Sequence, residues 1–249
     1  MPSRNASSLL PVLLLGVAGV FLLNQHRPTT EHEEAAAPTN QSVFTPKVSG
    51  ASTEGERALR SFKIPSGFEV SLFAAEPSVI NPVTLDVDGR GRVLVVEAYR
   101  RAHGGSVDNR HHAYWIDDDL LSETIEDRRA LLLKHHPEYP KQWEGISDRV
   151  RHLIDDDVDG RADRSLVFAD GFDDLLAGTA AGVLRVGDDV FFACIPEIWR
   201  LTDSDHDGIA ETREAVYTGF GVRIAYRGHD MHGLIQGPEI GRASCRERV

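Results

Sequence analysis

An acidic turn occurs twice in this chain at a spacing of 48 residues, and this repeat constrains the fold more than any other feature. Residues 155–172 read DDDVDGRADRSLVFADGF, and residues 203–220 read DSDHDGIAETREAVYTGF. Aspartates, glycines, an alanine and the final phenylalanine recur at the same offset. A weaker echo, DVDGRGR, covers residues 86–92. A period of this size is typical of propeller blades or of another repeat architecture.

The second copy matches the calcium loop of an EF-hand, with Gly208 at loop position 6 and Glu214 at position 12. An EF-hand needs a helix on each side of its loop. Here VFFACIPEIWRL precedes the loop and EAVYTGF follows it, and both are strand-like in composition. The first copy carries Leu166 at position 12. We therefore predict a turn between two antiparallel strands, with a glycine that permits the sharp bend.

The carboxylates of these turns are candidate metal ligands. Three aspartates at alternate positions converge on one centre, and calcium accepts hard oxygen ligands in flexible geometry. A regulatory ion would need a flanking pair of helices that moves when the ion binds, and no such pair is expected here. We therefore expect an ion with a structural role. An acidic hairpin without an ion is the alternative. The candidate ligands are Asp203, Asp205 and Asp207 in the second turn and Asp155, Asp157 and Asp159 in the first.

Most other segments also have strand chemistry. An exception is residues 120–136, LLSETIEDRRALLLKHH, which predict a helix with Ser122 as its N-cap and Pro137 as its stop. We predict an all-β fold, an incomplete β-propeller of about three blades, with a helical insertion at about residues 105–148. Strands are expected at residues 68–74, 82–88, 92–99, 150–156, 165–170, 182–186 and 190–195.

The two ends of the chain differ from its middle. Residues 9–23 are an unbroken apolar run after Arg4, too short for most spanning helices but typical of a signal sequence. We expect a signal peptide or membrane-anchor helix at residues 1–30, a disordered linker at 31–56 and a partial propeller at 57–238. The protein is then exported, and either periplasmic or anchored facing the periplasm. Residues 239–249 resemble translated sequencing adaptor, which makes the chain a fragment.

Charge and cysteine content exclude some classes of protein. The formal net charge of −12 argues against nucleic acid and anionic membrane surfaces as partners, because both attract an excess of Lys and Arg. Contact with a membrane is expected through the N-terminal segment alone. Cys194 and Cys245 form no disulfide framework, and Cys194 is expected to be a buried small hydrophobe.

Three segments in order carry a resemblance to a known family: FEVSLFAAEPSVINPVTLDVDGRGRVLVVEAYR, DRSLVFADGF and GHDMHGLIQGP. Together they resemble the membrane-bound dehydrogenase family of planctomycete-type bacteria over residues 62–238. The propeller is similar to those of soluble quinoprotein glucose and sorbosone dehydrogenases. The resemblance implies oxidation of a sugar or alcohol, with pyrroloquinoline quinone as a possible cofactor. Full-length members continue into a c-type cytochrome region, so the implied electron acceptor is a haem c domain outside this fragment.

The same resemblance implies a set of catalytic and cofactor residues. His229 matches the distance of the family's catalytic histidine from Gly237–Pro238, and His232 is three residues closer. An imidazole supplies the near-neutral base that oxidation of a C–OH requires. Among the neighbouring residues, Asp230 is a candidate to fix a histidine tautomer. Arg223 or Arg227 is a candidate to orient a quinone or to stabilise developing negative charge. The alternative is that both histidines hold a blade turn through hydrogen bonds.

Other interpretations stay open. A second hypothesis is a non-catalytic, calcium-stabilised propeller that binds carbohydrate or protein at the cell surface. A third is a hydrolase of the six-bladed lactonase type, with a central calcium and carboxylates. Arg100 and Arg101 either line a propeller mouth or form a surface basic pair, and residues 109–112 are expected to form a solvated loop.

Overall fold

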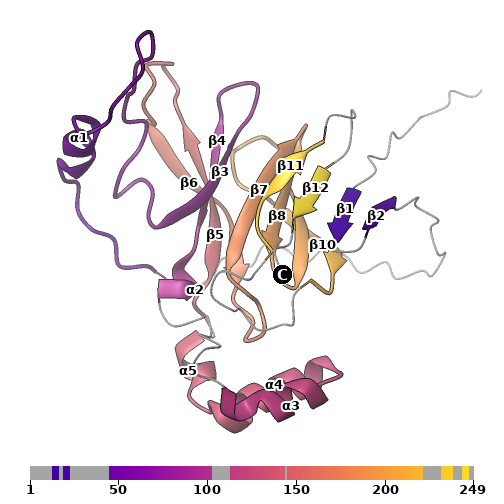
Figure 1. The fold of residues 1–249 in the computed structure, drawn as a ribbon. Helices are drawn as coiled ribbons and strands as arrows, with labels where there is room; N and C mark the ends of the chain where they lie inside the picture. Colours follow the sequence, from indigo (N-terminus) through magenta and orange to yellow (C-terminus); the bar gives the residue numbers. More distant parts are fainter. Residues whose placement is uncertain are drawn as a thin grey trace, which may run out of the picture.

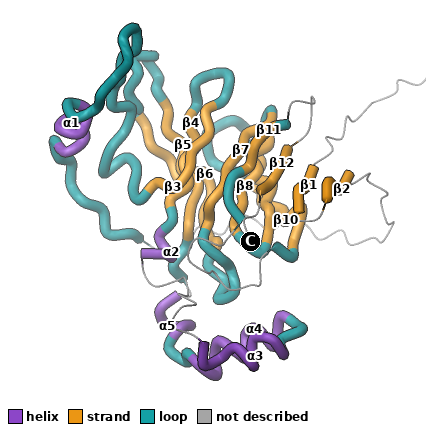
Figure 2. Tube along the Cα trace, viewed as in Figure 1, coloured by secondary structure: helices purple, strands orange, loops and turns teal. Residues whose placement is uncertain are grey.

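The computed structural model describes residues 13–16, 19–22, 45–102, 113–143, 145–220, 231–237 and 243–246. Strands are the main secondary structure of the described residues and form four-stranded sheets, with a small helical part below them (Figures 1 and 2). The all-β class predicted from the sequence is confirmed by this content.

The first complete sheet is an antiparallel meander in which each strand pairs with the next along the chain. Its second strand is buried on both faces. The hairpin expected at DVDGRGR joins the first two strands, and Asp88 closes it by accepting N–H bonds from Arg90 and Arg92. The strands are β3 (Pro82–Val87), β4 (Val93–Glu97), β5 (Asp148–Ile154) and β6 (Arg164–Phe172).

The second complete sheet repeats this plan, with antiparallel pairing in the order β10-β9-β8-β7. The predicted turn after Val186 is present, because Val186 pairs with Asp189 across Gly187 and Asp188. The strands are β7 (Ala180–Val186), β8 (Asp189–Cys194), β9 (Glu197–Thr202) and β10 (Thr212–Thr218).

A third sheet has the order β11-β12-β1-β2 and includes one parallel pair, β1 with β12. The described part of the predicted signal or anchor segment consists of two of these short strands, so the helix expected there stays a prediction. None of the helices in the described ranges is long and apolar enough to span a membrane. The strands are β1 (Leu13–Gly16), β2 (Gly19–Leu22), β11 (Leu234–Gln236) and β12 (Ala243–Arg246).

The two complete sheets pack face to face over one apolar core. Burial of each large apolar side chain here contributes about 1.5–3 kcal/mol. Residues alternate between the two faces of a strand, so one face of each sheet supplies this core. The contributors are Leu94, Val96, Val150 and Phe168 from the first sheet and Val183, Val190, Phe192 and Leu201 from the second.

The outer faces of the two sheets are covered differently. On the second sheet, Leu184, Ile195 and Ile198 pack against Met231 and against Leu234, the first residue of β11. On the first sheet, Val93, Val95 and Leu153 pack against Phe73 and Val79. On the same sheet, three side chains of β3 have exposed fractions of 44%, 59% and 53%: Val83, Leu85 and Val87.

The helical part lies between β4 and β5, where the insertion was predicted. The helix expected over residues 120–136 is in fact two helices. Thr124 rather than Ser122 is the N-cap of the second, with a capping box to Asp127; Ser122 instead donates to the Asp118 carbonyl. The short helix α1 (Glu54–Leu59) precedes the first sheet. The insertion itself contains α2 (Tyr99–Ala102), the 3-10 turn η2 (Ala113–Trp115), α3 (Ile116–Leu121), α4 (Ile125–His135) and α5 (Tyr139–Trp143).

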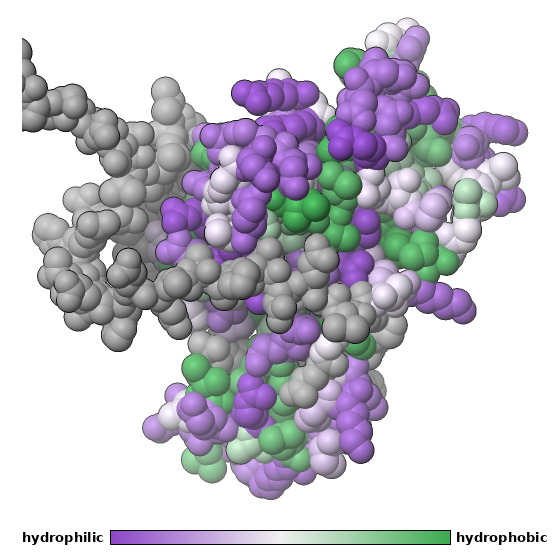
Figure 3. All heavy atoms as spheres, turned by 180° about the vertical axis from the view of Figure 1, so that it is seen from behind, coloured by the Kyte–Doolittle hydropathy of each residue, from purple (hydrophilic) through white to green (hydrophobic). Residues whose placement is uncertain are grey.

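These helices form a small core of their own beside the β6–β7 connection, with Trp115, Leu132 and Trp143 packed against Leu175 and Leu176. Their outer surface is partly apolar (Figure 3), since Leu120 and Leu121 are 77% and 76% exposed.

The prediction of a strand at residues 68–74 is wrong. These residues are not in a strand, although their alternation resembles one. Phe73 makes a single backbone contact with the first sheet, accepting from the amide of Ala162 at 2.9 Å. Without a neighbouring strand among the described residues, the segment has no ladder to join.

The order of strands gives each complete sheet two distinct ends. One, the hairpin end, holds the turns β3–β4, β5–β6, β7–β8 and β9–β10. The other, the helix end, holds the connections β4–β5, β6–β7 and β8–β9, and helices α2 to α5 lie there (Figure 1).

Candidate functional site

Both acidic turns join the third and fourth strands of their sheets, at the hairpin end. Residues 155–163 connect β5 to β6, and residues 203–211 connect β9 to β10. Their backbones also match. Val158 and His206 both have φ of 61°, and Gly160 and Gly208 have φ of 87° and 94°. The sequence repeat is therefore a structural repeat, and flanking strands exclude an EF-hand.

Glu214, which completes the EF-hand pattern, is not part of the turn. It lies in β10 and forms an ion pair with Arg200 on the neighbouring strand β9. The fourth carboxylate near the three aspartates is Glu211. The sequence analysis did not include Glu211. The signal that could have found it is Asp163, an acidic residue at the same position of the first turn.

The first turn is exposed to solvent, and carboxylates in it accept hydrogen bonds from amides of the turn itself. Asp155 accepts N–H bonds with both carboxylate oxygens, from Asp159 at 3.2 Å and Gly160 at 2.9 Å. Asp157 and Asp159 are exposed. The charge of Asp159 raises the pKa of Asp157. Asp163 accepts from the amide of Asp156 and is not part of the three-aspartate cluster.

The second turn is packed on the first sheet. The amide of Ala210 donates to the Phe168 carbonyl at 2.8 Å, and Gly208 lies against His152 and Leu166. Asp203 is consequently 3% exposed. Burial raises the pKa of Asp203, and the negative charges of Glu211 and Asp207 raise it further.

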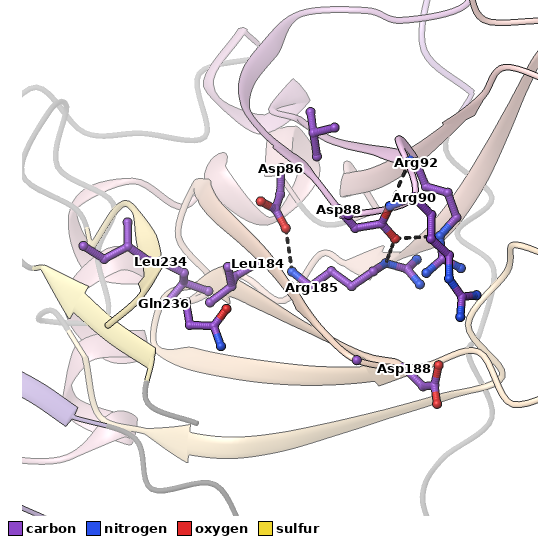
Figure 4. A pocket seen from close by; sticks show the side chains of 13 residues that line it. Asp86, Asp88, Arg90, Arg92, Leu184, Arg185, Asp188, Leu234 and Gln236 are labelled. Atoms are coloured by element: carbon purple, nitrogen blue, oxygen red, sulfur yellow. Dashed lines mark hydrogen bonds and ion pairs between the residues drawn. The ribbon is translucent and has the colours of Figure 1, made fainter. Parts of the chain in front are cut away.

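A cavity of about 750 Å³ opens at the same hairpin end, where β3, β7 and β11 come together (Figure 4). Asp86 accepts from the amide of Arg185 at 2.7 Å. Asp88 pairs with Arg92 at 2.6 Å and lies 3.9 Å from the Arg185 guanidinium. Asp88 therefore lies between two of the arginines that line the cavity.

The helix end contains a buried ionisable network. Glu97, fully buried, accepts from the Tyr99 hydroxyl at 2.7 Å, from Arg151 at 2.9 Å and from the amide of Ile80 at 2.8 Å. Burial and the Glu97 carboxylate raise the pKa of Tyr99. A charge this far from water is held by several hydrogen bonds at once.

Arg100 and Asp148 extend this network toward the second sheet. Asp148 is fully buried and accepts from the amides of Arg100 at 2.9 Å and Ala180 at 2.8 Å. Burial raises its pKa to about 6. The interpretation of Arg100 as part of a surface pair is wrong, since it is fully buried and its guanidinium donates to the Asp174 carbonyl; Arg101 is exposed.

The residues proposed for catalysis are only partly described. His229, Asp230, Arg223 and Arg227 lie outside the described residues, as do residues 109–112. His232 is exposed. It precedes Gly233, whose amide donates to Ala181 at the start of β7, and this contact locates His232 at the helix end. Cys194 is buried as predicted and its thiol donates to the Gly178 carbonyl.

Fold and site together define a strand-rich domain of antiparallel four-stranded sheets with acidic β-hairpins. A family model described as a domain of unknown function, DUF7133, matches residues 54–242, so the chain belongs to this family. Among curated proteins and among solved structures, nothing matches the chain.

Proposed function

We propose that the two complete sheets are consecutive blades of a β-propeller. Each is a four-stranded antiparallel sheet, and such sheets arranged radially make a propeller. Two successive sheets share one core. Their first strands, β3 and β7, lie side by side, and β11 follows next to β7. The first strands of successive sheets thus follow one another as they do around a propeller axis.

The contacts of the hairpins support the same arrangement on the other side of the first sheet. Ala210 donates to Phe168 in the last strand of the preceding sheet, and Ala162, which is 48 residues earlier, donates to Phe73. Phe73 therefore occupies the place that the last strand of a preceding blade would have. The exposed apolar side of β3 lies on this outer face.

On this scaffold, we propose an exported oxidoreductase that acts on a sugar or alcohol at the helix end. The observation that supports it is the separation of the two ends. The hairpin end holds the turns within each sheet, whereas the helix end gathers the connection with the helical insertion, the buried network of Glu97, Arg100 and Asp148, and His232. A neutral imidazole there accepts the hydroxyl proton of the substrate.

The cofactor and acceptor are parts of this proposal. A quinone would accept the electrons and a c-type haem domain would take them onward. Arg223 and Arg227, the candidates to orient the quinone, lie outside the described residues, and we derive no step through the quinone. The N-terminal segment is proposed to direct export. Fusing residues 1–60 to a reporter active only in the periplasm tests that part.

Dye-linked activity of the full chain tests the oxidoreductase. We expect dye reduction with a panel of aldoses and alcohols in the presence of pyrroloquinoline quinone and calcium. His229→Asn abolishes it, and His206→Asn, in a hairpin at the opposite end, leaves it unchanged. Asparagine is chosen because it tolerates the positive φ of His206. Equal losses in both variants, or no reduction with any substrate, count against the proposal.

A second candidate is a non-catalytic, calcium-stabilised propeller that binds carbohydrate or protein. The acidic hairpins and the 750 Å³ cavity, all at the hairpin end, favour it. A carbohydrate array separates the two candidates: binding that survives His229→Asn but is lost on Asp86→Ala supports this module, and binding that needs His229 supports the oxidoreductase.

A further inference from the structure

The second hairpin gathers four carboxylates. One oxygen from each of them lies within 4.8 Å of the others. The hairpin's own amides use part of this acceptor capacity: Gly208 donates to Asp203, Asp207 to Asp205, Ile209 to Asp207 and Ser204 to Glu211. Every carboxylate retains acceptor capacity beyond these bonds. The four residues are Asp203, Asp205, Asp207 and Glu211.

A separate observation points to a ligand. The Oδ1 atom of Asp203 is buried and, within the described ranges, has no hydrogen-bond partner. A buried carboxylate oxygen without a partner is unfavourable, because it has lost water and gained nothing in exchange. The nearby guanidinium of Arg185 makes its ion pair with Asp88 instead. A cation at the centre of the cluster would satisfy this oxygen.

We propose that the hairpin 203–211 binds one calcium ion through Asp203, Asp205, Asp207 and Glu211. All four donors are hard oxygens, and calcium accepts six to eight of them in flexible geometry. Magnesium is less suitable, because it demands near-ideal octahedral geometry and keeps most of its water. The site lies at the hairpin end and is independent of the proposed oxidoreductase, which acts at the helix end.

The first hairpin does not support the same proposal. Both oxygens of Asp155 already accept amides, and Asp157 and Asp159 face solvent. Its ninth residue, Asp163, is exposed and outside the cluster. We therefore infer one ion per chain at the second hairpin, although the two turns share the same spacing of aspartates and glycine.

Calorimetric titration of the chelator-treated full chain tests this proposal, with calcium chloride and then magnesium chloride as probes. We expect one calcium per chain and affinity for magnesium at least tenfold weaker. Asp203→Asn and Glu211→Gln weaken calcium binding at least tenfold. The equivalent changes in the first hairpin, Asp155→Asn and Asp163→Asn, alter it less than twofold.

Several outcomes would overturn the proposal: no calcium binding by the wild type, two equivalent ions, or the same loss from Asp155→Asn as from Asp203→Asn. Circular dichroism checks that each variant is folded. If Asp203→Asn does not fold, Glu211→Gln decides, because Glu211 is only partly buried and tolerates an amide. Dye-linked activity is not used as a readout, so the result stands apart from that of the proposed oxidoreductase.

Discussion

The two acidic hairpins have the same turn but different surroundings. Nothing lies within 4 Å of a side chain added at Gly160, whereas one added at Gly208 meets Leu166 at 2.9 Å and His152 at 3.1 Å. Asp203 is buried, and its counterpart Asp155 is partly exposed. Local sequence therefore makes the turn, while packing on the preceding sheet decides whether its first aspartate is buried.

The largest expected difference between the hairpins concerns their alanines. Ala210 is fully buried in the core between the sheets, whereas Ala162 is partly exposed. We expect Ala210→Leu to reduce the free energy of unfolding by about 3 kcal/mol because it overpacks that core. Ala162→Leu should cost less than about 1 kcal/mol. Urea unfolding measures both, and equal losses would show that the hairpins are packed alike.

The glycines should differ by a smaller amount. Both have positive φ, so alanine costs about 1 kcal/mol at Gly160 through backbone strain alone. Gly208→Ala should cost about 2 kcal/mol, since its methyl group also displaces Leu166 and His152. The same urea experiment compares them. A larger loss at Gly160 would contradict the packing described for the second hairpin.

The first aspartates of the two hairpins should differ in how they make the stability of the protein depend on pH. In metal-free protein the raised pKa of Asp203 means that the folded state keeps this proton above the ordinary value of 3.8. Its contribution to stability is present at low pH and is lost as the pH rises through the folded pKa. Asp203→Asn should therefore gain stability relative to wild type as the pH rises from 4 to 7.

Asp155 provides the matched control for that pH series. At pH 7 without metal, Asp155→Asn should lose about 1 kcal/mol, because the amide cannot accept both N–H bonds. Thermal unfolding in chelator across this pH range measures both variants. A pH-independent difference between Asp203→Asn and wild type would show that the buried charge is not the cause.

The smallest effect is expected for an ion pair present in the first hairpin alone. Arg164 contacts Asp156 at 2.6 Å, and both side chains are about half exposed; the second hairpin has Thr212 and Ser204 at these positions. Exposed pairs contribute little to stability. Arg164→Ala should leave the unfolding midpoint within experimental error, and this result should be the same in high salt.

Much of the fold was predictable from the sequence because its signals are local. Alternating apolar residues and Asp-Gly or Gly-Asp turns indicated β3 to β10 and their hairpins. The segment at residues 68–74 has the same alternation but failed, because a strand also needs a neighbour to pair with. The helical region was located correctly, but Thr124 outcompeted Ser122 as the cap because its capping box with Asp127 satisfies two amides.

The sequence by itself determined the repeat, the turn geometry and six of the carboxylates that line the two hairpins. These follow from glycine at positive φ and from residue spacing along one chain. Tertiary structure alone decided that Asp203 is buried while Asp155 is not, that Glu211 joins the cluster and that Arg100 is inside the protein. The physical reason is that burial depends on which segment packs against a residue, and those segments lie far away in the sequence.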